Sequence, residues 1–177
     1  MEKYSHLKTK IREIDNFPTP GVKFKDIAPL LEDKSSFREA VNGIAYFFSA
    51  EGEKIDKVVG IESRGFLFAS SIAYLLNTGV VMVRKKDKLP YQKIFRHHSL
   101  EYGKGLLEMH VDSVKKGEKI LIVDDVLATG GTAEAAIKLV LDLGGDIVGA
   151  GFLIELPFGG REKLKRYKIE SLIHYEK

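Results

Sequence analysis

The sequence ILIVDDVLATGGT at residues 120–132 is the clearest guide to the fold of this chain. Its first four residues are apolar and mostly β-branched, which is typical of a central parallel strand buried on both faces. Asp124 and Asp125 come at the carboxyl end of this predicted strand, and a turn of small residues then leads into a helix with a 3.6-residue apolar period. A strand followed by a helix in this way begins a βαβ unit, so we predict an α/β protein.

The turn at this strand end consists of Ala128, Thr129, Gly130, Gly131 and Thr132. A glycine-rich turn at a helix start exposes backbone N–H groups and the positive end of the helix dipole, which together suit a phosphate monoester. The two carboxylates before the turn can accept hydrogen bonds from the vicinal hydroxyls of a ribose. We therefore predict a ribose 5-phosphate site. Strand-end carboxylates also often cap a turn or face solvent, but their combination with this turn favours the site.

Other phosphate-binding motifs do not fit. The sequence has no G-x-x-x-x-G-K-[ST] motif, and Gly149-Ala150-Gly151 lacks a third glycine at Ile154. These observations argue against nucleotide hydrolysis and dinucleotide binding.

The rest of the chain repeats the alternation of strands and helices. Residues 58–61 and 80–83 are predicted strands joined by a helix over residues 66–76, and a second unit covers residues 120–154. Residues 1–35 are predicted as a helix followed by a segment bent by Pro and Gly, residues 37–48 as a helix, and residues 91–95 and 106–111 as a hairpin. Because ligands bind beyond the carboxyl ends of parallel strands, loops 62–65, 84–88, 124–132 and 155–158 are expected to surround one site.

Composition limits the remaining classes of function. A chain of 177 residues with 44% hydrophobic residues is long enough for one domain over residues 1–177 and short for two. The absence of cysteine excludes disulfides and thiolate chemistry and fits a cytoplasmic location. No apolar run approaches the ~20 residues of a membrane span. With 28 basic and 25 acidic residues interleaved, neither a membrane nor a nucleic acid is the expected partner.

The chain resembles the adenine-specific branch of the type I phosphoribosyltransferase family. The resemblance rests on segments in family order over nearly the whole chain: FPTPGVKFKDIAPLL at 17–31, VVGIESRGF at 58–66, RKKDKLP at 84–90, SLEYGK at 99–104, VDDVLATGGT at 123–132, IEL at 154–156 and GREKL at 160–164.

The resemblance implies a central, mostly parallel, twisted sheet flanked by helices. A small hood would be formed by residues 1–35 and by a flexible catalytic loop at residues 87–107. The implied reaction moves the phosphoribosyl group of 5-phosphoribosyl 1-diphosphate to adenine and yields AMP and diphosphate, as in purine salvage. Mg²⁺ is the expected cofactor, and a homodimer with the Arg84 region near its interface is the expected assembly.

The resemblance also implies roles for individual residues. The ribose and its 5-phosphate would be bound by Asp124, Asp125, Ala128, Thr129, Gly130, Gly131 and Thr132. The diphosphate would be bound by Ser63, Arg64, Arg84, Lys85 and Lys88, and adenine by Phe24, Lys25 and Leu156. Catalysis would use Glu101, Tyr102 and Arg64. Mg²⁺ would be held through the substrate diphosphate, with no direct ligand from the protein.

The residues alone leave simpler interpretations open. Residues 62–65 also fit an ordinary strand-to-helix turn, and residues 84–88 also fit a solvated basic face. The segment around Glu101 could be an exposed hairpin tip, and Phe24 could be an aromatic residue of the core.

The chain departs from the family pattern at several positions. Lys25 stands where Arg is usual, Asp87 where Gly is common, and residues 91–98 are unusually basic and aromatic. A Lys25 side chain could donate to a 6-oxo group, so transfer to hypoxanthine, guanine or xanthine is an alternative. A ligand-sensing regulator, which would bind the donor without turnover, is another alternative. Such a regulator is expected to carry a DNA-binding module, for which this chain has no room.

Overall fold

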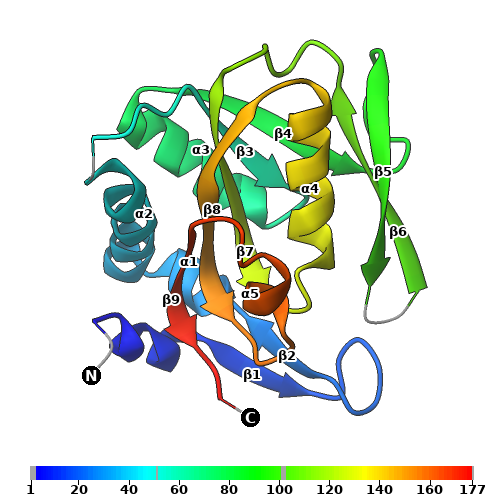
Figure 1. Ribbon diagram of the computed structural model, residues 1–177. Coiled ribbons are helices and arrows are strands. Elements are labelled where there is room, and N and C mark those ends of the chain that lie inside the picture. Colours follow the sequence, from blue (N-terminus) through cyan, green and yellow to red (C-terminus); the bar gives the residue numbers. More distant parts are fainter. Residues whose placement is uncertain (1–2, 51, 101–102, 177) are drawn as a thin grey trace.

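A computed structural model describes residues 3–50, 52–100 and 103–176 and is built around a seven-stranded sheet (Figure 1). The strand order is β5-β6-β4-β3-β7-β8-β9. Five strands run parallel: β3 (Lys57–Ile61), β4 (Gly79–Lys85), β7 (Lys119–Leu127), β8 (Asp146–Glu155) and β9 (Ile169–His174). At one edge, the hairpin of β5 (Lys93–Leu100) and β6 (Gly103–His110) joins β4 in antiparallel orientation. The predicted mostly parallel α/β sheet is confirmed.

Helices cover both faces of this sheet. Helices α2 (Lys34–Ser49) and α3 (Gly65–Leu76) lie on one face, and α4 (Gly131–Asp142) lies on the other (Figure 1). Strand β7 supplies side chains to both cores, since Leu121 and Val123 belong to the cluster with α2 and α3 while Ile120 and Ile122 belong to the cluster with α4. The apolar run of residues 120–123 is thus buried on both faces, as its sequence predicts.

Strand β7 continues further than the sequence suggests. The ladder with β8 extends through Val126↔Ile154 and Leu127↔Glu155, so Asp124 and Asp125 lie within the last part of the strand. The reason is that β8 is itself ten residues long and offers paired backbone groups as far as Glu155. Only after Leu127 does the chain turn toward α4.

The N-terminal segment differs most from the prediction. Its expected helix is the short 3-10 helix η1 (Ser5–Lys10), and the bent segment contains an antiparallel pair of strands, β1 (Arg12–Asp15) and β2 (Lys23–Asp26), followed by α1 (Ala28–Glu32). All four residues of β1 are exposed, so the strand lacks the alternation that would reveal it in the sequence. The pair lies beyond the carboxyl ends of β8 and β9 (Figure 1), where a hood is expected.

The predicted hairpin at residues 91–95 and 106–111 is confirmed as β5 and β6, with Phe95 opposite Glu108. Arg96 ties this hairpin to the end of α4 through a two-pronged ion pair with Asp142, at 2.6 and 2.7 Å. Asp87 adopts a left-handed backbone with φ 61°, a conformation that glycine, the residue expected here from the family pattern, adopts without strain. The opening and closing of residues 87–107 remains a prediction.

The last helix, α5 (Gly160–Lys163), connects β8 to β9. No helix in the described ranges is long and apolar enough to cross a membrane.

Candidate active site

A cavity of about 1030 Å³ lies between the β1–β2 pair and the ends of β7 and β8. It brings together residues that the sequence assigned to three different subsites: Phe24, Lys25, Arg64, Ala128, Thr129, Thr132 and Leu156. These residues come from four segments far apart in the chain. Three of the segments follow the parallel strands β3, β7 and β8, which end at one edge of the sheet, and the fourth is strand β2 of the antiparallel pair.

Arg64 connects the subsites. Its Nη2 lies 2.7 Å from Oδ2 of Asp125, its Nη1 donates to the backbone carbonyl of Lys25 at 3.3 Å, and its guanidinium carbon lies 4.9 Å from the centre of the Phe24 ring. The sequence assigned Arg64 to the diphosphate and to catalysis. The structure places it between the proposed adenine residues and the proposed ribose carboxylates, where a fixed positive charge acts on both.

The two aspartates form an adjacent acidic pair. Asp125 is only 6% exposed and Asp124 is partly buried, and Oδ1 of Asp124 accepts a hydrogen bond from the backbone N–H of Asp125 at 2.9 Å. Burial raises the pKa of Asp124 well above its usual value, and the neighbouring charge of Asp125 adds to this effect. Burial also raises the pKa of Asp125, although the Arg64 charge opposes the rise. Neither aspartate is among the residues that line the cavity, but the ion pair with Arg64 connects Asp125 to that lining. Carboxyl groups with shifted pKa values are often found at functional sites.

Asp124 approaches the start of α3 so closely that only glycine fits there. A Cβ atom added to Gly65 would lie 2.6 Å from Oδ1 of Asp124 and 3.1 Å from the carbonyl oxygen of Val123. Because Gly65 directly follows Arg64, a larger side chain at residue 65 would displace Asp124 or the backbone next to Arg64.

The turn of residues 128–132 has the geometry of a phosphate cradle. Gly130 is left-handed, with φ 77°, and α4 begins at the next residue. In a helix the first backbone N–H groups have no intrahelical acceptor, so the amides that follow Gly130 are available to an anion. The turn is supported from behind by Gly160, whose N–H donates to the carbonyl of Ala128 at 3.0 Å.

The predicted adenine residues Phe24, Lys25 and Leu156 line the cavity. Phe24 packs edge-on against Phe17, with ring centroids 5.1 Å apart. The ammonium of Lys25 forms an ion pair with Glu13 and lies 3.9 Å from the centre of the Tyr175 ring. This side chain is therefore already engaged.

Several cavity residues were not singled out from the sequence: Val22, Val126, Phe158 and Tyr175. Phe158 belongs to loop 155–158, which was expected to reach the site, whereas Tyr175 follows a strand that gave no clear signal.

Apart from Arg64, the predicted diphosphate residues lie at the neighbouring ends of β3 and β4 and are not among the residues that line the cavity. Nε and Nη2 of Arg84 lie 3.2 and 3.4 Å from the two carboxylate oxygens of Glu62, which also accepts the backbone N–H of Lys85 at 2.8 Å. Burial of Glu62 opposes its ionisation, but the Arg84 and Lys85 hydrogen bonds lower its pKa overall. Nη1 of Arg84 donates to the carbonyl of Lys88 at 3.5 Å, and Ser63 is exposed. The sequence gave no role to Glu62, although it orients this cluster.

The predicted catalytic residues Glu101 and Tyr102 lie outside the described residues. Within the described ranges, no group of three or more His, Cys, Asp or Glu side chains is placed to hold a metal ion.

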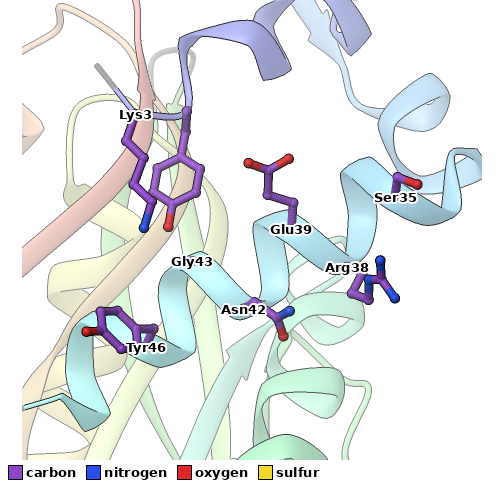
Figure 2. A pocket seen from close by; sticks show the side chains of 8 residues that line it. Lys3, Ser35, Arg38, Glu39, Asn42, Gly43 and Tyr46 are labelled. Atoms are coloured by element: carbon purple, nitrogen blue, oxygen red, sulfur yellow. The ribbon is translucent and has the colours of Figure 1, made fainter. Parts of the chain in front are cut away.

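A second cavity, of about 510 Å³, lies on the outer side of α2. Figure 2 shows Arg38, Asn42 and Tyr46 along that helix, with Lys3 from the N-terminal segment beside them. The cavity is remote from the strand ends, and its lining in the described part of the chain includes no predicted site residue.

Comparison with known proteins gives consistent matches. The family described as phosphoribosyl transferase domain matches residues 30–174. The adenine phosphoribosyltransferase of Geobacter metallireducens is 52% identical over 170 residues, which cover 96% of this chain and 98% of that protein.

Solved structures agree. The crystal structure of adenine phosphoribosyltransferase from Thermoanaerobacter pseudethanolicus has a TM-score of 0.91 at 46% identity and covers 96% of this chain and 98% of its own. The Saccharomyces cerevisiae enzyme, solved with an iminoaltritol bisphosphate and adenine, has a TM-score of 0.86 at 36% identity and covers 95% of this chain and 97% of its own.

Proposed function

The chain belongs to the phosphoribosyltransferase family, within its adenine phosphoribosyltransferase branch, and from this membership we infer its reaction. It transfers the 5-phosphoribosyl group of 5-phosphoribosyl 1-diphosphate to adenine and releases AMP and diphosphate, which is a step of purine salvage. In this transfer a ring nitrogen of adenine bonds to the anomeric carbon as the bond from that carbon to the diphosphate oxygen breaks.

The observation that carries this function is the continuity of one cavity from Phe24 to Thr132, with Arg64 between its two sides. A base bound near Phe24 can then meet the anomeric carbon of a donor whose 5-phosphate is bound at the turn before α4, without either substrate leaving its subsite. Holding two reactants in this way accounts for a large part of the rate enhancement of a transfer reaction.

We assign the donor to the acidic pair and the turn that follows it. The ribose hydroxyls donate to Asp124 and Asp125. The 5-phosphate accepts hydrogen bonds from the backbone amides of residues 128–132 and from the side-chain hydroxyls of Thr129 and Thr132. The charged acidic pair also stabilises the positive charge that develops on the ribose as diphosphate departs. Binding a diol and a nearby cation favours ionised carboxyls, which offsets the burial that raises the pKa of Asp124 and Asp125.

The leaving diphosphate is assigned to Ser63, Arg64, Arg84, Lys85 and Lys88. A cation held ~4 Å from a phosphate charge contributes up to roughly 4 kcal/mol at an effective dielectric near 20, before desolvation is deducted. Arg84 is held by Glu62 at the neighbouring strand end, so it is ordered before the substrate arrives.

Mg²⁺ completes the proposal as a cofactor held through the oxygens of the donor diphosphate. It prefers oxygen ligands and keeps several waters, so the carboxylates of Asp124 and Asp125 suit its surroundings without either being required as a direct ligand. When bound, it neutralises charge on the departing diphosphate.

The hood excludes water from the anomeric carbon, because water there would hydrolyse the donor. Within it, Glu101 exchanges a proton with the adenine ring and Tyr102 helps to close the site.

Adenine is favoured over 6-oxopurines. Donation to a 6-oxo group would need a free Lys25 ammonium. That ammonium instead pairs with Glu13 and lies against the Tyr175 ring. Phe24 stacks on the base, Leu156 forms an apolar wall, and Lys25 contributes through its backbone.

A homodimer is also part of the proposal. Apolar side chains of α3 and β4 are exposed on one side of the described structure: Leu67, Tyr74, Val80 and Met82. Exposed apolar surface of this kind is typical of an interface, and Arg84 lies at the end of the same strand β4. A cytoplasmic location, which suits purine salvage, completes the proposal.

The experiment that tests the function follows AMP formation from adenine and the ribosyl donor while donor binding is measured by calorimetry on the same preparation. Binding together with AMP formation is expected. Tight binding of the donor without any nucleotide product would instead assign the chain to the regulators, and loss of product on addition of a metal chelator is the expected result for Mg²⁺.

A further inference from the structure

The loop of residues 155–161 joins the end of β8 to α5 and contains part of the GREKL segment, to which no role has yet been given. Its two ends are tied by an ion pair. Nε of Arg161 lies 2.9 and 3.1 Å from the two carboxylate oxygens of Glu155, and Nη2 lies 2.7 Å from Oε2. A two-pronged pair of this kind fixes direction as well as distance.

The pair is partly shielded from solvent. The Glu155 side chain is 15% exposed and that of Arg161 is 46% exposed. Burial of Glu155 opposes its ionisation, yet hydrogen bonds from Arg161 and Ser171 hold its pKa below the ordinary value, so the carboxylate is charged at neutral pH. Nη1 of Arg161 also donates to the carbonyl of Ile169 at 3.2 Å, which ties the loop to the start of β9.

One side of the loop forms part of the base subsite. Leu156, Pro157 and Phe158 lie between the paired residues and line the cavity. The N–H of Leu156 donates to the carbonyl of Leu127 at 2.8 Å, and this hydrogen bond fixes the position of Leu156 relative to the end of β7.

The other end of the loop supports the phosphate turn. Besides the hydrogen bond from Gly160 to Ala128, a Cβ added to Gly160 would lie 2.5 Å from the Ala128 carbonyl oxygen, and one added to Gly130 would lie 3.0 Å from the Gly160 carbonyl oxygen. The two backbones are therefore in direct contact, and a shift of Gly160 moves the turn that holds the phosphate.

We propose that Arg161 is a positioning residue which, by closing loop 155–161 on Glu155, sets the spacing between the base wall and the phosphate turn. The inference rests on the proposed function, because it needs a base on one side and a phosphate on the other. Arg161 touches neither substrate. Its effect on the KM values of both substrates is exerted through Leu156 and Phe158 on one side and through Gly160 on the other.

The test compares Arg161→Met, Arg161→Lys and Glu155→Gln in steady-state kinetics with both substrates varied. Arg161→Met keeps an apolar stem of similar length, and we expect it to raise the KM for adenine and the KM for the donor together, each by roughly tenfold. The basis is that a displacement of about 1 Å near reacting groups can cost about a hundredfold. Arg161→Lys keeps the positive charge but not the two-pronged geometry, so both of its KM values should lie between those of the wild-type protein and those of Arg161→Met.

Lys165→Met is the matched control. Lys165 lies just after α5 and pairs with Glu162 at 2.6 Å, but both side chains are more than two-thirds exposed, at 68% and 75%. An exposed pair contributes little, so wild-type KM values are expected. Thermal unfolding of every variant distinguishes an unfolded protein from a folded protein in which loop 155–161 is displaced. If Arg161→Met does not fold, Glu155→Gln is compared with the wild-type protein instead.

Wild-type turnover of adenine tests the proposed function separately and comes first. Given that turnover, folded Arg161→Met or Glu155→Gln variants with both KM values unchanged would overturn the positioning role. So would a rise in one KM alone, because the loop touches both subsites.

Discussion

Replacing Gly65 by alanine is the perturbation whose size can be worked most directly from the structure. The added Cβ would lie 2.6 Å from Oδ1 of Asp124, whereas ordinary van der Waals contact begins at 3.4 Å. Asp124 or the start of α3 must therefore move by about 0.8 Å, the difference between these two distances. Either movement disturbs the proposed ribose site, since Gly65 follows Arg64 and Asp124 precedes Asp125.

The substitution should lower activity while the protein still folds. Overpacking costs about 1–3 kcal/mol, and replacing glycine by alanine in a helix returns at most about 1 kcal/mol, so the net loss in unfolding free energy is about 3 kcal/mol or less. A displacement close to 1 Å near the reacting atoms can lower kcat/KM by about a hundredfold. We expect kcat/KM for the ribosyl donor to fall by roughly 10- to 100-fold.

The assay measures initial rates over a range of donor concentrations for Gly65→Ala, with denaturant unfolding in parallel. Gly79→Ala is the control, because a Cβ there meets its nearest neighbour, Cγ of Lys57, at an ordinary 3.4 Å. Wild-type donor kinetics in a folded Gly65→Ala protein would refute the assignment of Asp124 to the ribose.

Four further changes test other parts of the site. Phe24→Leu should raise the KM for adenine by roughly tenfold and leave the donor KM unchanged, because stacking on a base is worth about 1–3 kcal/mol; initial rates with adenine varied check this. Arg84→Ala should raise the donor KM or lower turnover, whereas Lys86→Ala, which removes a side chain that is 70% exposed, should do neither in the same assay. Glu101→Gln should lower kcat, and nearly normal turnover would remove Glu101 from the mechanism. Asp124→Asn should abolish activity yet stabilise the free protein at neutral pH. Burial raises the pKa of Asp124 above 3.8, so the folded state binds this proton more tightly than the unfolded state, and the stabilisation from that proton is lost as the pH rises through the raised value. In denaturant unfolding, the gain in unfolding free energy from Asp124→Asn should shrink as the pH falls toward 3.8. A gain that increases on acidification would contradict the raised pKa of Asp124.

The parallel core and its ligand edge could be predicted because their signals are local. The apolar run at residues 120–123 is buried on both faces, and the turn at residues 128–132 begins a helix as its glycines indicate. Since parallel strands end at one edge, four loops could be placed around one site before their side chains were known.

What the sequence did not reveal depends on contacts between distant segments. Strand β1 is exposed along its whole length, so nothing in its pattern marks it as a strand. The family resemblance assigned Arg64 to the diphosphate, and only the approach of β2 brings it against Phe24 and Lys25. The Glu155–Arg161 pair likewise joins residues whose meeting depends on how the loop closes.

The most direct test of the account supplies the purified protein with 5-phosphoribosyl 1-diphosphate and, in parallel, adenine, hypoxanthine, guanine or xanthine, with Mg²⁺ or with a chelator, and measures the nucleotide formed. The account predicts AMP from adenine, in the presence of Mg²⁺, and little or no nucleotide from the three oxopurines. Comparable or faster formation of a 6-oxopurine nucleotide would contradict it, because the Lys25 ammonium would then have to leave Glu13 to serve the base.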